Sequence, residues 1–328
     1  MRLLKILPFI LFPICISAQT PEKQKLKEYF ISDKGDTIRF YIHTADNLKK
    51  EKVFLYIQGS GDLPLVNGDN AEPCCYNNYP RKLMADFPKD YAFVYIQKVG
   101  LPYYTKTLDG YTPSQTFIHR NNVLDRAEVA NKVINYIKRR IYPDAKIIAV
   151  LGHSEGSDVV VKLATRNKHI THICFSAGNA NAQIFNDILF TRRDMLSGNI
   201  SAAQAQAKID ELMNGFNQIY LKPNSTQDYF NGDTYKWNTA INEPPINNLL
   251  KLNIPIFLTI GSNDDKVPVE ASDLVVVEFI RNRKNNLTSK VYLNCNHNFE
   301  EIKEDGTKIS RWNEMFFDFL NFVEKDPK

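Results

Sequence analysis

The stretch Gly152-His153-Ser154-Glu155-Gly156 decides how the rest of the sequence is interpreted. It matches the Gly-x-Ser-x-Gly nucleophile elbow, in which a serine sits on a tight turn between a strand and a helix. The context agrees, because the apolar run 146–151 is typical of a buried strand and residues 158–163 continue as a helix would. Backbone N–H groups at the start of such a helix point to the place where an oxyanion would form. An ordinary strand-turn-helix with glycines chosen for tightness is the alternative.

The N-terminal residues 1–18 have the composition of a secretory signal peptide. Two basic residues precede an apolar stretch, and Ser17-Ala18 supplies the small residues of a cleavage site. The stretch is too short and too interrupted by proline to span a bilayer well, although an uncleaved anchor is the alternative. We therefore predict an exported domain over residues 19–328, periplasmic or secreted, with no stable membrane insertion.

The charge of the chain argues against two classes of partner. Removing residues 1–18 lowers the formal net charge of the 328-residue chain from +4 to about +2, which is too little to indicate binding to nucleic acid or to an anionic membrane. The hydrophobic content of 43 % is sufficient for one large core. We expect the partner to be a small-molecule or peptide substrate, and the sequence leaves the oligomeric state open.

The cysteines and the glycine-rich loop give no sign of a cofactor. Cys174 lies within an apolar run and is most simply a buried small hydrophobe, whereas the vicinal Cys74-Cys75 leaves a strained disulfide, pairing with Cys295 and free thiols all open. The Cys295-x-His297 pair stands alone, so we expect no metal. Gly59-Ser60-Gly61 lacks a following Gly-Lys-Ser/Thr, so we expect no nucleotide cofactor.

Short apolar runs alternate with amphipathic helical patterns along the chain. Because this alternation is typical of a parallel sheet, we predict an α/β fold with a mostly parallel central sheet and helices on both faces. An N-terminal hairpin over residues 28–43 precedes this pattern. The predicted buried strands are 53–57, 91–96, 146–151, 170–175, 254–260 and 290–293, and the clearest helices are 121–141 and 312–323.

A long interruption separates two of these strands, over residues 179–250. Within it, Ser201-x-x-Gln204 forms a capping box that opens a helix with four apolar residues expected to face inward: Ile209, Leu212, Met213 and Phe216. This apolar face is either part of the core or the roof of a pocket. We predict a helical lid, or cap, over the pocket of Ser154.

Two further loops supply the groups that a nucleophilic serine needs. The hydroxyl requires a histidine to take its proton and a carboxylate to orient the imidazole. Among the six histidines only His297 follows the last strand after a candidate acid, Asp264, and the order Ser, Asp, His results. Asp265 is the alternative acid. Asp264 stands three residues after Gly261 and three before Val267.

With these residues the chain resembles the α/β-hydrolase family. The resemblance rests on Gly59-Ser60-Gly61, the elbow at 152–156, Gly261-x-x-Asp264-x-x-Val267-Pro268 and Asn296-His297-Asn298. Within the family the chain looks most like exported serine-aminopeptidase-like and acyl-esterase-like hydrolases. It departs from them at Gln58, where many relatives have histidine, and at Ser157, where a further glycine is common.

The resemblance implies an activity and the residues that perform it. Ser154, Asp264 and His297 would form the triad, with Asp264 preferred to Asp265 because hydrolases of this kind carry the acid at this spacing. The backbone N–H groups of Ser60 and Glu155 would form the oxyanion hole. We predict an exported serine hydrolase that cleaves an ester, or an amide, through an acyl-enzyme on Ser154. The alternatives are a peptidase or aminopeptidase-type hydrolase and a non-catalytic binding protein on a hydrolase scaffold.

Overall fold

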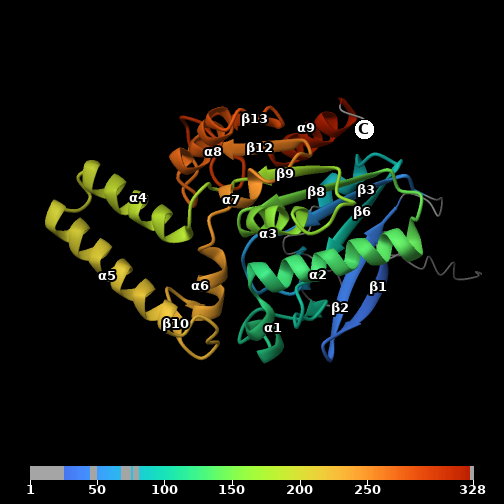
Figure 1. Cartoon of the computed structure of the whole chain (residues 1–328), viewed down its shortest axis with the longest axis horizontal. Helices are drawn as coiled ribbons and strands as arrows, with labels where there is room; N and C mark the ends of the chain where they lie inside the picture. Colours follow the sequence, from blue (N-terminus) through green and yellow to red (C-terminus); the bar gives the residue numbers. More distant parts are fainter. Residues whose placement is uncertain (1–25, 45–49, 68–74, 77–80, 326–328) are drawn as a thin grey trace, which may run out of the picture.

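The computed structural model describes residues 26–44, 50–67, 75–76 and 81–325, so the predicted signal peptide and Cys74 lie outside the described residues. Its centre is an eight-stranded sheet (Figure 1). In spatial order the strands are β1 (Leu26–Asp33), β2 (Asp36–His43), β6 (Tyr91–Ile96), β3 (Lys52–Ile57), β8 (Ile147–His153), β9 (His172–Ser176), β12 (Ile256–Gly261) and β13 (Leu287–Tyr292). Neighbours from β6 to β13 pair in parallel, and β1, β2 and β6 pair antiparallel.

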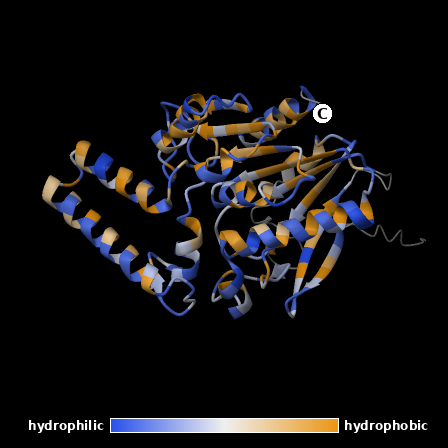
Figure 2. Cartoon of the chain, in the orientation of Figure 1, coloured by the Kyte–Doolittle hydropathy of each residue, from blue (hydrophilic) through white to orange (hydrophobic). Residues whose placement is uncertain are grey.

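Helices cover both faces of this sheet, as the sequence predicted. Along β3, Val53 and Leu55 belong to one apolar cluster, while Phe54 and Tyr56 belong to a second cluster on the opposite face, because successive strand residues point to opposite sides. The first cluster is completed by α2 (Val123–Tyr136), α3 (Glu155–Ala164) and α8 (Val269–Arg281). The second is completed by the short η1 (Arg81–Ala85) and by α9 (Trp312–Lys325). Figure 2 shows the strands as predominantly hydrophobic and α2 as mixed.

Smaller elements lie around the sheet. Three short strands form a separate small sheet: β4 (Val66–Asn67), β5 (Cys75–Tyr76) and β7 (Tyr104–Thr105). Two two-stranded ribbons are formed by β10 (Tyr229–Phe230) with β11 (Asp233–Thr234), and by β14 (Glu300–Ile302) with β15 (Lys308–Ser310). Helix α1 (Gln115–Arg120) precedes α2, which ends in a π-helical turn, η2 (Ile137–Ile141). Within the described residues, no helix is both long and apolar enough to cross a membrane.

The interruption between β9 and β12 is helical. It contains α4 (Gln183–Leu196), α5 (Ala202–Leu221), α6 (Tyr235–Ile241) and α7 (Ile246–Leu249). Helices α4 and α5 extend away from the body, and the chain then returns to it through α6 (Figure 1). Lys236 on α6 donates a hydrogen bond to Asp125 on α2 at 3.0 Å, so the returning part of the insertion is tied to the body beside α3.

One detail of the insertion differs from the sequence prediction. The capping box at the start of α5 is present, with the side chains of Ser201 and Gln204 each bonded to the other's backbone N–H. Met213, however, is 45 % exposed, whereas Leu212 is buried. The prediction that Met213 faces inward was wrong, because consecutive helical residues lie about 100° apart and the buried stripe of α5 is narrow.

Candidate active site

The functional residues predicted from the sequence follow four strands of the main sheet. Residues 58–61 follow β3, Ser154 follows β8, Asp264 follows β12 and His297 follows β13. These four strands run parallel, and β9 separates β8 from β12. Because the carboxyl ends of parallel strands meet at one edge of the sheet, all four segments gather at that edge.

Ser154 lies on a strained turn that only the surrounding glycines permit. Its φ is 57° and its ψ is −130°, a conformation that side-chain-bearing residues rarely adopt. A Cβ atom on Gly152 would lie 2.1 Å from the carbonyl oxygen of Gly156, and one on Gly156 would lie 2.3 Å from the carbonyl oxygen of Ile57. The glycines therefore let β8, α3 and the end of β3 approach closely, and Ser154 remains partly accessible at the edge.

Asp264 and His297 are in direct contact. The Asp264 carboxylate oxygens lie 2.9 and 3.0 Å from Nδ1 of His297, and the carboxylate is fully buried. The backbone N–H groups of Lys266 and Val267 each donate to Asp264 Oδ1 at 2.8 Å, which holds the carboxylate in place. Since a carboxylate only accepts hydrogen bonds, Nδ1 carries the proton and Nε2 is the nitrogen free to accept one.

The neighbouring Asp265 has different surroundings. Its side chain is 58 % exposed and pairs with Lys266 at 3.1 Å. The loop that carries both aspartates packs tightly on the histidine loop, because a Cβ atom on Gly261 would lie 2.3 Å from the carbonyl oxygen of Cys295. Cys295 itself is a buried free thiol, as is Cys174. Asp264 is thus the aspartate that the structure places against the imidazole.

His153, next to the serine, packs against the ring of His297. Their ring centroids are 4.9 Å apart, and the Trp312 ring lies 4.7 Å from His153 on an edge-to-face geometry. Burial and the nearby His297 hold the pKa of His153 well below its usual value, so this ring stays neutral and contributes packing rather than charge. The sequence did not indicate this contact, because no local pattern shows which ring lies beside His297.

The predicted oxyanion loop lies directly beside the serine. A Cβ atom on Gly59 would be 3.0 Å from Ser154 Cβ and 3.6 Å from Ser154 Oγ. Ser60 follows at the exposed surface. Glu155 is the first residue of α3, so its N–H has no partner within the helix, and its buried side chain forms an ion pair with Arg126 at 2.8 Å.

Two buried cations beside this loop were not anticipated. Arg126 contacts the loop from α2, and Lys98 Nζ donates to the carbonyl oxygen of Gly61 at 2.7 Å. Burial, together with the charge of Arg126, lowers the pKa of Lys98 to about 7. Burial alone would raise the pKa of Glu155, but the charges of Arg126 and Lys98 hold it below its usual value. Arg126 interrupts the apolar stripe of its helix, and this pattern in the sequence could have indicated a buried charge.

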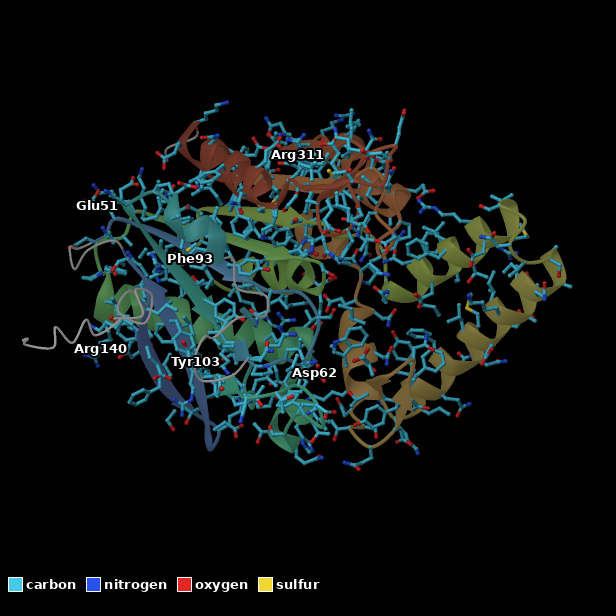
Figure 3. All side chains as sticks on the ribbon, turned by 180° about the vertical axis from the view of Figure 1, so that it is seen from behind. Glu51, Asp62, Phe93, Tyr103, Arg140 and Arg311 are labelled. Atoms are coloured by element: carbon cyan, nitrogen blue, oxygen red, sulfur yellow. The ribbon has the colours of Figure 1, made fainter. Side chains whose placement is uncertain are left out.

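Acidic side chains also act on Lys98, because the charges of Asp62 and Asp233 oppose the lowering of its pKa. Asp62 directly follows the oxyanion loop, on the side of the body from which the insertion extends (Figure 3). Asp233 belongs to the insertion, and burial together with the charge of Glu155 raises its pKa to about 6. Within the part of the chain that the structure describes, no group of three or more His, Cys, Asp or Glu side chains is placed to hold a metal ion.

The architecture is similar to that of solved hydrolases. An acylaminoacyl peptidase from Pyrococcus horikoshii aligns with 92 % of this chain at a TM-score of 0.59 and 14 % identity, and dipeptidyl peptidase 4 from Porphyromonas gingivalis aligns with 91 % at 0.55 and 12 %. An esterase from Pyrococcus furiosus aligns with 93 % of this chain and 94 % of its own length, at 0.54 and 12 % identity. At such identities these similarities show a common fold and do not establish an activity.

The peptidases are much longer proteins than this chain. The chain spans 42 % of the length of the acylaminoacyl peptidase and 35 % of the length of the dipeptidyl peptidase. Comparison with known protein families finds no match, and comparison with curated protein sequences finds none.

Proposed function

We propose that this chain, which has the α/β-hydrolase fold, is an exported serine hydrolase that cleaves an ester or amide bond through an acyl-enzyme on Ser154. The observation that carries the proposal is the contact between the buried Asp264 carboxylate and His297 Nδ1 at 2.9 Å. Because Nδ1 faces Asp264, Nε2 of His297 can act as the base. Ser154 follows β8 at the same edge of the sheet. Export rests on the sequence of residues 1–18 alone.

Each residue has one role in the proposed reaction. Ser154 Oγ attacks the substrate carbonyl carbon while its proton passes to Nε2 of His297, and Asp264 stabilises the imidazolium. The carbonyl oxygen becomes an oxyanion facing the N–H groups of Ser60 and Glu155. Collapse of this intermediate breaks the bond to the leaving group, which takes the proton from His297. Water then attacks the acyl-enzyme by the same route and releases the acid.

We also propose that the insertion over residues 179–250 acts as a lid for this pocket. Its returning part lies beside the site, since Lys236 is bound to Asp125 on α2 and the charge of Glu155 raises the pKa of Asp233. Helices α4 and α5 extend outward from there (Figure 1). Such an insertion selects substrates by closing over them.

Reaction with a fluorophosphonate probe tests the activity without knowledge of the substrate, because the probe phosphonylates a serine only when a neighbouring base activates it. We expect one adduct per chain, located at Ser154 by peptide mass spectrometry and absent from Ser154→Ala. A folded wild-type chain that takes up no probe would instead favour a binding protein on a hydrolase scaffold. Turnover of p-nitrophenyl esters against aminoacyl p-nitroanilides then separates esterase from peptidase activity.

A further inference from the structure

The guanidinium of Arg126 lies behind both halves of the proposed oxyanion hole. Its side chain is only 8 % exposed. Nη1 donates to Glu155 Oε1 at 2.8 Å and to the carbonyl oxygen of Gly59 at 3.3 Å, and Nη2 donates to the carbonyl oxygen of Gln58. One side chain on α2 therefore joins the loop after β3 to the first residue of α3.

These contacts act on the two residues whose N–H groups would form the oxyanion hole. In a trans peptide the C=O and N–H bonds are antiparallel, so a carbonyl of Gly59 held toward Arg126 turns the N–H of Ser60 to the opposite side. On the elbow side, the bond to Glu155 holds the residue whose backbone N–H is the second donor. The two donors belong to separate elements, and Arg126 is bonded to the elements that carry both.

We propose that Arg126 is a positioning residue that aligns the N–H groups of Ser60 and Glu155 on the developing oxyanion. This inference rests on the proposed function and adds to it a residue that touches neither substrate nor reacting atoms. Misalignment of oxyanion donors costs transition-state stabilisation while leaving ground-state binding largely intact, because the charge on the oxygen develops only in the transition state.

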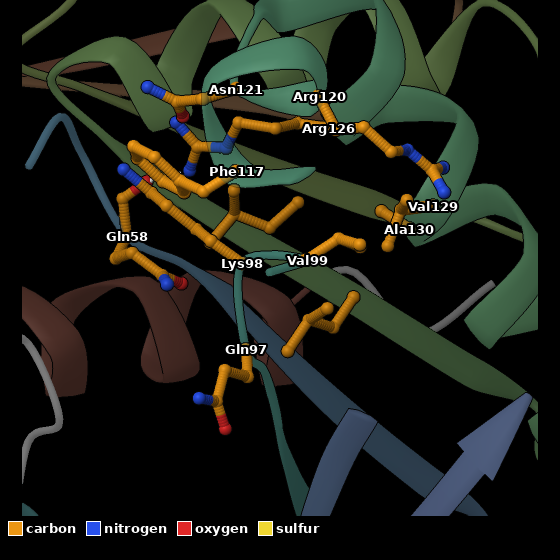
Figure 4. Close-up of a pocket in the computed structure, with 12 residues that line it drawn as sticks. Gln58, Gln97, Lys98, Val99, Phe117, Arg120, Asn121, Arg126, Val129 and Ala130 are labelled. Atoms are coloured by element: carbon orange, nitrogen blue, oxygen red, sulfur yellow. Dashed lines mark hydrogen bonds between the residues drawn. The ribbon is translucent and has the colours of Figure 1, made fainter. Parts of the chain in front are cut away.

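The surroundings of Arg126 support this role. A cavity of about 30 Å³ lies beside it, and Gln58, Lys98 and Arg126 are among the residues that line this cavity (Figure 4). Lys98 Nζ donates to the carbonyl oxygen of Gly61, two residues after Gly59, at 2.7 Å. Arg126 thus holds the loop by the carbonyl oxygens of Gln58 and Gly59, and hydrogen bonds from a charged group are stronger than neutral ones.

A matched control is available in the same region. Arg120 is also 8 % exposed and also forms a 2.8 Å ion pair, with the buried Asp33 of the N-terminal hairpin. Arg120 also pairs with Asp36 at 3.1 Å, so Arg120→Met breaks at least as many ion pairs as Arg126→Met. Only the second removes the contacts to the oxyanion loop, so a comparison of the two separates loss of folding stability from loss of alignment.

The experiment measures kcat and KM for a p-nitrophenyl ester, with the concentration of active serine determined by titration with a fluorophosphonate. It also measures the Ki of a trifluoromethyl ketone, because the adduct of this inhibitor places an oxyanion in the oxyanion hole. For Arg126→Met we expect kcat to fall about 100-fold with KM changed less than about threefold, and Ki to rise in parallel. Arg126→Lys, which keeps the charge but not the forked geometry, should recover part of the loss. Arg120→Met should keep kcat near wild type.

The outcomes separate this inference from the proposed function. A wild-type chain that is not labelled overturns the proposed function and this inference with it. A labelled wild type, with Arg126→Met as active as Arg120→Met, overturns this inference alone. If Arg126→Met does not fold, Arg126→Lys carries the test, and a wild-type kcat and Ki in that variant would overturn the role.

Discussion

Both carboxylate oxygens of Asp264 lie within hydrogen-bond distance of Nδ1 of His297, at 2.9 and 3.0 Å. The two residues are 33 positions apart and follow different strands, β12 and β13. The backbone N–H groups of Lys266 and Val267 also donate to Oδ1 of this carboxylate and hold it in place. The carboxylate therefore favours the His297 tautomer with the proton on Nδ1.

This contact predicts unequal effects for the two neighbouring aspartates. Asp264→Asn should lose up to about 10⁴-fold in kcat, because an amide N–H facing Nδ1 favours the wrong imidazole tautomer. Asp265→Asn should lose less than about fivefold, since Asp265 is exposed and bound to Lys266. Ester turnover and circular dichroism on both variants provide the measurement. The reverse ranking would assign the acid to Asp265.

The elbow predicts a steric effect at Gly156. A Cβ atom there would lie 2.3 Å from the carbonyl oxygen of Ile57, a backbone atom that cannot rotate away. Gly156→Ala should therefore lower the free energy of unfolding by about 3 kcal/mol or more and abolish probe labelling. Gly306→Ala is the control, because Gly306 has φ +82° but open space around it. Gly306→Ala should lower the free energy of unfolding by only about 1 kcal/mol and leave probe labelling of Ser154 unchanged. Equal effects of the two substitutions would contradict the close approach.

Asp187 on α4 predicts a pH-dependent stability. Burial raises the pKa of its carboxyl to about 6. Since the folded chain holds this proton more tightly than the unfolded chain, wild-type stability falls as pH rises from about 4 to 6, and the penalty is complete above 6. Asp187→Asn removes the penalty. It should stabilise the chain by on the order of 2 kcal/mol at pH 8 and by little at pH 4.

Urea unfolding at the two pH values provides the measurement. Asp210→Asn on α5 is the control, because Asp210 is exposed and its replacement should change stability by less than about 0.5 kcal/mol at either pH. A gain from Asp187→Asn that is equal at pH 4 and pH 8 would show that burial of the charge is not its cause.

If the insertion is a lid, the hydrogen exchange of its backbone amides should change when Ser154 carries a substrate-like phosphonate. Amides of α4 and α5 should become more protected when Ser154 carries a long-chain alkyl phosphonate, because the insertion would then close over the alkyl group. A methyl phosphonate on the same serine should leave these amides as they are in the free protein. If neither adduct alters exchange across residues 183–221, the insertion is not a lid for this pocket.

Local patterns in the sequence determined the fold. Apolar runs of strand length alternating with amphipathic helices predicted the parallel sheet, and the structure and its solved neighbours confirm that architecture. The glycines at 152 and 156 marked a close approach of backbone to backbone, which depends on the absence of a Cβ and is therefore visible in the sequence. The choice of Ser154, Asp264 and His297 as a triad stays a prediction until activity is measured.

Tertiary structure alone decided which side chains meet. Asp264 and Asp265 have the same chemistry and adjacent positions, and only the packing of two loops shows which of them faces His297. The same holds for Arg126, which as a sequence feature is one charge on a helix. The free energy of a buried charge depends on its partners, and the partners of Arg126 lie on segments 29 and 68 residues away along the chain.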